Sequence, residues 1–86
     1  MTEAPRLEDL HWINQNEPGE LVPPGTITRH ADIGPNLLTI FQWDDGKYDI
    51  DNASISIWKG IDALTAQCVL IELHNEGKLY PVGNET

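Results

Sequence analysis

Basic residues are scarce in this chain. Five lysines and arginines stand against fourteen aspartates and glutamates in 86 residues, which gives a formal net charge of −9. A surface this negative repels the phosphates of nucleic acids and of anionic membranes, and it attracts basic protein surfaces. The imbalance therefore argues against direct nucleic-acid binding and favours a basic protein surface as the partner.

Cysteine and long apolar runs are nearly absent as well. Cys68 is the only cysteine, so no internal disulfide can form and the staples of small secreted domains are lacking. Residues 1–5 have neither the basic nor the apolar region of a signal peptide, and the longest apolar run, 68–71, is too short to span a bilayer. We therefore expect a cytoplasmic protein with no membrane partner.

The remaining composition is that of a folded protein. Hydrophobic residues make up 40% of the chain and charged residues 22%, both ordinary values for a globular domain. A chain of this length is expected to form one domain with a small core. We predict a single acidic domain over 1–86, with a loose N-terminal tail at 1–9 and a loose C-terminal tail at 81–86.

Strand and helix patterns alternate with clear turn signals. Apolar and β-branched stretches predict strands at 26–30, 37–43, 47–51 and 54–57. A helix is predicted over 63–75, because Asp62 is a good N-cap and Gly77 stands at the C-cap position. Together these predict an α+β fold, in which an antiparallel meander of three or four strands is covered by one C-terminal helix.

The turn at Asp45-Gly46 is the clearest local signal, and it allows two registers. A two-residue loop would pair Trp43 with Tyr48 and set Phe41 opposite Ile50, all on one apolar face. A three-residue loop over 44–46 would instead pair Trp43 with Lys47. We favour the two-residue loop, because it separates apolar from charged side chains.

The predicted helix has an unusually wide apolar arc. Ala63, Ala66, Leu70 and Leu73 form one stripe, and a second stripe beside it contains Leu64, Cys68 and Ile71. Val69 falls on the narrow polar side. An arc this wide needs either two contacts within the protein or a partner. Cys68, in the middle of an apolar stripe, is predicted to be a small core residue rather than a reactive thiol.

Four carboxylates lie within eight residues around the predicted hairpin. In the favoured register, the strand face that carries Asp49 and Asp51 also carries Gln42. We predict that this acidic cluster is a docking surface with an aromatic anchor, formed by the following residues: Gln42, Trp43, Asp44, Asp45, Asp49 and Asp51. The alternative is a solvated strand face with no binding role. In either case, lysine at both 49 and 51 is expected to leave the fold nearly intact.

No motif for catalysis, metal or cofactor binding is present. An EF-hand loop counted from Asp49 would need glycine and glutamate where Ser54 and Gly60 stand. The three histidines, at 11, 30 and 74, lack the spacing of a metal site. The seven glycines are dispersed and form no phosphate loop. We therefore predict no cofactor, no metal and no enzymatic activity.

Three classes of function are compatible with these features. The first is an acidic inhibitor, of the immunity or phage anti-defence type, that docks on a basic protein surface meant for nucleic acid. The alternative is an assembly subunit that forms a homodimer through a sheet edge or through the apolar helix. The third and weakest is an enzyme or ligand-binding module, with a pocket between sheet and helix and His30 or His74 at its mouth.

Overall fold

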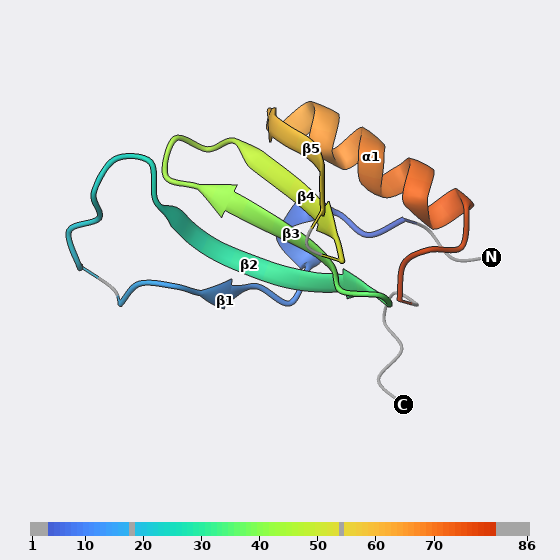
Figure 1. Ribbon diagram of the computed structural model, residues 1–86, viewed down its shortest axis with the longest axis horizontal. Helices are drawn as coiled ribbons and strands as arrows, with labels where there is room; N and C mark the ends of the chain where they lie inside the picture. Colours follow the sequence, from blue (N-terminus) through green and yellow to red (C-terminus); the bar gives the residue numbers. More distant parts are fainter. Residues whose placement is uncertain (1–3, 18, 54, 81–86) are drawn as a thin grey trace.

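A computed structural model of the chain describes residues 4–17, 19–53 and 55–80. A short 3-10 helix, η1 (Leu7–Asp9), and a two-residue strand, β1 (Ile13–Asn14), precede the main elements. These are β2 (Ile27–Gly34), β3 (Leu38–Trp43), β4 (Tyr48–Asn52), β5 (Ile55–Ile61) and α1 (Ala63–Asn75). The strands form one antiparallel sheet in the order β1-β2-β3-β4-β5, with the helix after it (Figure 1).

The predicted α+β meander with a C-terminal helix is confirmed. The sheet has five strands instead of three or four, because the two residues of β1 pair with Arg29 and His30 of β2. β1 was not among the strands predicted from the sequence. β2 is also longer than predicted and continues to Gly34.

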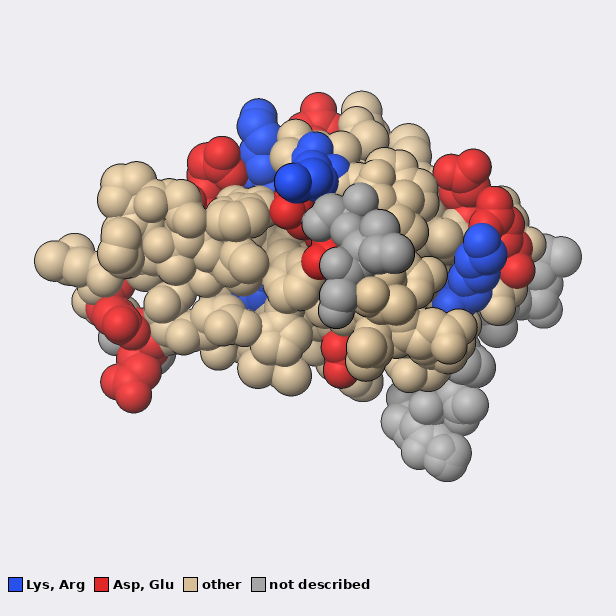
Figure 2. Space-filling model, in the orientation of Figure 1, with Lys and Arg blue, Asp and Glu red and all other residues tan. Residues whose placement is uncertain are grey.

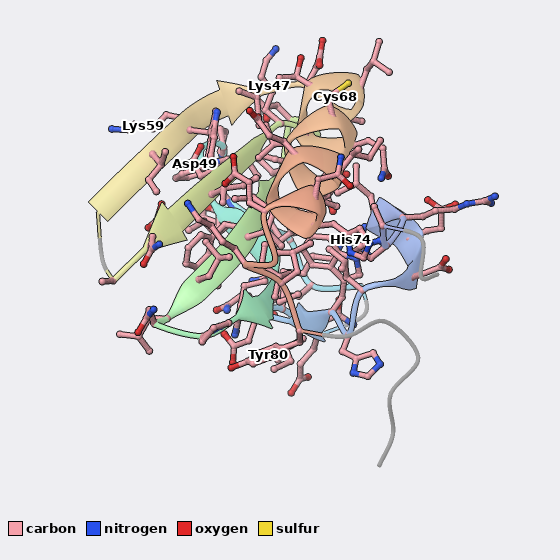
Figure 3. All side chains as sticks on the ribbon, turned by 90° about the vertical axis from the view of Figure 1, so that its right-hand side faces the viewer. Lys47, Asp49, Lys59, Cys68, His74 and Tyr80 are labelled. Atoms are coloured by element: carbon pink, nitrogen blue, oxygen red, sulfur yellow. The ribbon has the colours of Figure 1, made fainter. Side chains whose placement is uncertain are left out.

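The molecule has two layers, with α1 and η1 on the same face of the sheet (Figures 1 and 3). Strand alternation directs every second side chain toward these helices. The resulting core contains the following residues: Leu7, Ala31, Ile33, Leu38, Ile40, Tyr48, Ile50, Ala66, Val69, Leu70 and Leu73. No helix covers the opposite face among the residues that the structure describes, and we call that face of the sheet the open face.

The β3–β4 hairpin has the three-residue loop, so the favoured two-residue register is wrong. Ile40 pairs with Ile50, and the Trp43 amide donates to the Lys47 carbonyl at 2.8 Å. Gly46 has φ of +87° and donates to the Trp43 carbonyl at 3.0 Å, which closes a loop of residues 44–46. This register places Ile40 and Ile50 together under α1, both with no exposed surface.

The helix begins and ends where the sequence predicts. Asp62 is the N-cap, and its carboxylate accepts a hydrogen bond from the Thr65 amide at 2.8 Å. The hydrogen bonds from Thr65 lower the pKa of Asp62. At the other end Gly77 has φ of +73°, and the amides of Gly77 and Lys78 donate to the carbonyls of His74 and Leu73, both at 3.0 Å. This pair of bonds is the Schellman motif, which satisfies carbonyls of the last turn.

The rotation of α1 about its axis differs from the prediction. Val69, placed on the polar side by its neighbours in sequence, is buried at 5% exposure. Leu64 is 76% exposed, Ile71 is 44% exposed, and Cys68 lies at the surface of α1 (Figure 3). The prediction that Cys68 is a core residue is therefore wrong. The helix uses only one of its two apolar stripes to contact the sheet.

The N-terminal segment is held against the helix. The amide of Leu7 donates to Oε1 of Gln67 at 3.0 Å, while Nε2 of the same glutamine donates to the Pro5 carbonyl at 2.8 Å. The indole of Trp12 donates to the Leu7 carbonyl at 2.7 Å. Within the stretch predicted to be a loose tail, Pro5 and Leu7 are thus hydrogen-bonded to Gln67 of α1. Residues 1–3, and the predicted tail at 81–86, lie outside the described residues.

The chain after α1 returns to the end of β2. The Tyr80 amide donates to the Ile33 carbonyl at 2.9 Å, and Leu79 packs against the core. This contact is a single hydrogen bond, and residues 78–80 form no strand. Gly34 permits the close approach, because a Cβ built there would lie 2.3 Å from the Lys78 carbonyl oxygen and 2.9 Å from a Leu38 methyl.

We expect Gly34→Ala to lower the free energy of unfolding by about 2 kcal/mol, because the added methyl cannot fit without moving the 78–80 segment. Denaturant titration measures the loss. The matched comparison is the same substitution in a chain that ends at Gly77. Without Lys78 most of the clash is gone, so the loss should shrink there. An equal loss in both chains would show that the clash with Lys78 is not its cause.

Candidate protein-binding surface

The centre of the open face is a row of side chains that crosses β1, β2 and β3. Ile13 lies opposite His30, and His30 lies opposite Phe41. The rings of His30 and Phe41 are 6.1 Å apart between centroids, which confirms that they share this face. Trp43 and Ile27 form the next cross-strand pair. Ile13 is 55% exposed and the other four are half-buried, so the row presents apolar and aromatic surface to solvent.

A second row, closer to the β2–β3 turn, is acidic. Asp32 pairs with Thr39, and Thr39 pairs with Asp51. Oγ1 of Thr39 donates to an Asp32 carboxylate oxygen at 3.3 Å. Asp32 is exposed, Asp51 is half-buried, and both lie on the same face as Phe41 by strand alternation. The aromatic row therefore has carboxylates along one side.

The predicted acidic cluster is not one surface in the structure. Asp44 and Asp45 are exposed at the β3–β4 turn, where each carboxylate already holds a backbone amide. Asp44 accepts from Gly25 at 3.1 Å, and Asp45 accepts from Lys47 at 2.9 Å. Trp43 and Asp51 lie on the open face. Partner binding through Trp43, Asp44, Asp45 or Asp51 stays a prediction. Asp44 and Asp45 also stabilise the turn through the hydrogen bonds that they accept.

Asp49 is buried, whereas both the docking-surface prediction and its alternative, a solvated strand face, require it to be exposed. Its side chain is 9% exposed and accepts a hydrogen bond from the Gly60 amide at 2.8 Å. The β4–β5 register shifts between Tyr48 and Ile50, and Gly60 takes φ of +62°. This bulge turns an amide of the edge strand toward the carboxylate. Figure 3 shows Asp49 at the sheet, with Lys59 pointing outward beside it.

Gln42 belongs to the covered face. It lies opposite Arg29 and Tyr48, and its Oε1 accepts a hydrogen bond from Nε of Arg29. The guanidinium of Arg29 lies 4.1 Å from the centroid of the Trp12 ring. The placement of Gln42 beside Asp49 and Asp51 followed from the wrong hairpin register. Gln42 is instead part of the packing between β2, β3 and the N-terminal segment.

The charges around the open face are dispersed. Figure 2 shows this face, on which acidic side chains lie in several separate groups with uncharged residues between them. Basic side chains lie at the top of this view, over β5, and at its right-hand side beside acidic ones. The face thus combines uncharged surface with separate charged groups, and protein-binding surfaces have a similar mixture of apolar and polar area.

The histidines do not form a shared site. His30 lies on the open face beside Gln15, whereas His74 lines a shallow groove between α1 and the N-terminal segment, on the other side of the sheet. Within the described part of the chain, no three His, Cys, Asp or Glu side chains are grouped to hold a metal ion. In the same part, no helix is long and apolar enough to cross a membrane.

Of the apolar residues on the open face, only Trp43 was predicted from the sequence as a binding residue. The available signal was the stretch from Leu37 to Phe41, which is apolar at every position except Thr39, since a strand with apolar residues at both odd and even positions places hydrophobic side chains on both faces. No protein-family model, curated protein or solved structure matches this chain.

Proposed function

We propose that this protein is a non-enzymatic protein-binding module whose docking surface is the open face. Its partner is a basic, nucleic-acid-handling protein, and the module acts as an inhibitor of the immunity or phage anti-defence type. The observation that carries the proposal is the row of Ile13, His30, Phe41 and Trp43, which no helix of the described chain covers. The proposal also rests on the net charge of −9.

Aromatic side chains and charge have different parts in this proposal. Phe41 and Trp43 supply rigid apolar area at the centre of the face, where binding energy in protein interfaces is concentrated. The carboxylates at the border, Asp32 among them, attract a basic surface and speed encounter. Docking by such a module would block a surface meant for phosphates. The exposed carboxylates therefore mainly affect the association rate, and the aromatic row mainly affects the lifetime of the complex.

The test is capture of the partner by a paired set of tagged variants. The open-face variant carries Phe41→Ser with Trp43→Ser, and the control carries Leu64→Ser with Ile71→Ser on the outer side of α1. From host lysate, the wild type and the control should retain the same basic protein and release it as salt rises. The open-face variant should bind the purified partner about 30-fold more weakly, corresponding to about 2 kcal/mol.

Before the affinities are compared, circular dichroism is used to check that both variants are folded. Loss of capture in the helix variant, with retention in the open-face variant, would contradict the proposal and move the interface to α1. A partner that is neither basic nor sensitive to salt would contradict the charge argument.

The second candidate, self-association, is favoured by one specific observation. Leu64, Cys68 and Ile71 follow the i, i+4, i+7 spacing of a helix face and are all exposed on α1. A sheet edge is a weaker route, because β5 has a bulge at Gly60 and a lysine at 59, both of which oppose edge pairing. Sedimentation equilibrium separates the candidates: a dimer that Ile71→Glu dissociates would support assembly through the helix.

A further inference from the structure

A second concave surface lies on the covered side of the sheet, between β5 and the C-terminal half of α1. We call it the α1–β5 groove, and its volume is about 280 Å³. It is lined by the following residues: Leu38, Asn52, Ile57, Trp58, Glu72, Leu73, Glu76 and Lys78. None of these belongs to the open face or to the acidic cluster predicted from the sequence.

The floor of the groove is apolar and well packed. Leu38 and Leu73 belong to the core and are only 2% and 5% exposed. Trp58 is half-buried and packs against the same core. Ile57 is 49% exposed at the lip. A side chain that entered the groove would therefore meet preformed apolar walls, one of them an indole ring, at little cost in reorganisation.

The mouth of the groove is negative. Glu72 and Glu76 are exposed on the last turn of α1 and just beyond it, where the helix carbonyls add negative partial charge. Nζ of Lys78 lies 3.2 Å from the Glu76 carboxylate, so the chain itself already places a cation at this point. The Glu76 charge is thus partly compensated within the chain, which leaves Glu72 as the main attraction for an external cation.

We propose that the α1–β5 groove is an anchor site for an arginine side chain of the partner, an inference that rests on the proposed function. Arginine combines an aliphatic stem, which suits the floor, with a planar guanidinium that stacks on indole and pairs with carboxylates. The chain contains a related arrangement internally, where Arg29 lies over the Trp12 ring and donates to the side-chain amide oxygen of Gln42. An anionic ligand would be repelled by Glu72 and by the helix end.

The test uses the full chain labelled with 15N and two capped amino acids as probes. Acetyl-arginine-amide is titrated against acetyl-citrulline-amide, which has nearly the same shape without the charge. We expect saturable shifts for the arginine probe at Leu73 and at the indole resonance of Trp58, assigned with Trp58→Phe, and much weaker shifts for the citrulline probe. Glu72→Gln should weaken arginine binding about three- to fivefold, whereas Glu8→Gln, on η1, should leave it unchanged.

Several outcomes would overturn this site. Equal binding of the two probes would show that the site does not recognise the arginine charge. Shifts confined to the open face would show that arginine does not bind in the α1–β5 groove. No effect of Glu72→Gln would remove the proposed ion pair. These failures are distinguishable from failure of the proposed function, which is decided by loss of partner capture in the Phe41→Ser, Trp43→Ser variant. Both the open-face test and the groove test can therefore fail independently.

Discussion

Replacing Leu70 by alanine is expected to lower the free energy of unfolding by about 2–5 kcal/mol. Leu70 has no exposed surface and is one of the three largest fully buried side chains of the described chain, together with Ile40 and Ile50. Its removal leaves a cavity between α1 and the sheet in addition to the lost transfer energy. Urea denaturation followed by tryptophan fluorescence measures the change, and a domain of this size has little stability to spare.

Leu64→Ala is the matched control, since it makes the same chemical change on the same helix. Leu64 is 76% exposed, so we expect its truncation to change stability by about 0.5 kcal/mol or less. Equal losses at the two positions would mean that α1 is rotated relative to this structure or that its outer stripe is covered in solution. A negligible loss at Leu70 would place the core elsewhere.

This pair of leucines shows how far the sequence determines α1. The capping residues Asp62 and Gly77 fix the ends of the helix, because their interactions are local and depend on residue type alone. The rotation about the axis is not local. Both apolar stripes are plausible inner faces, and Gln67, which holds the N-terminal segment through two hydrogen bonds, lies beside the one that is used. A contact sixty or more residues away in sequence leaves no trace in the periodicity of the helix.

The hairpin register has a similar explanation. The sequence locates the turn from Asp45-Gly46, but a glycine with positive φ closes a two-residue or a three-residue loop equally well. The two-residue loop was favoured because it separates apolar from charged side chains. That criterion is valid only if one face of the strands is apolar and the other is not. In the structure both are: Ile40 and Ile50 meet α1, while Phe41 and Trp43 lie on the open face. The register is decided by which apolar set the helix covers.

The residues predicted for the binding site depended on the predicted hairpin register, so the correction of the register also changed which of them share a face. Net charge predicted a basic partner, and this proposal does not depend on where any one carboxylate points. The residues were less predictable, because a short acidic run contains side chains with different tasks. Asp45 is hydrogen-bonded in the turn, Asp51 is on the open face, and Asp49 is bonded to the edge strand. The environments of Asp49 and Asp51 differ because the β5 bulge at Gly60 directs an amide to Asp49. That bulge was not predicted from the sequence.

The largest expected effect of a single substitution is that of Asp49→Lys, which should lower the free energy of unfolding by about 4 kcal/mol or more. The change removes the acceptor of the Gly60 amide, which lies 2.8 Å from the carboxylate, and it brings an ammonium group into a position that is 9% exposed. An unsatisfied buried donor and an unpaired buried charge are both costly. Sequence reasoning alone expects lysine at 49 and 51 to leave the fold nearly intact, so thermal denaturation decides between the two views.

Two further variants identify the cause. Asp49→Asn keeps an oxygen that can accept from Gly60 and should cost only about 1 kcal/mol, since the charge is lost but the bond is retained. Asp32→Lys makes the same charge change at an exposed position of the open face and should alter stability by about 1 kcal/mol or less. If Asp49→Lys were as stable as Asp32→Lys, the Asp49 carboxylate would have to be solvated. Asp49 would then be available for binding, as the sequence predicted. If Asp49→Asn were as damaging as Asp49→Lys, the charge itself would be holding β5 to the sheet.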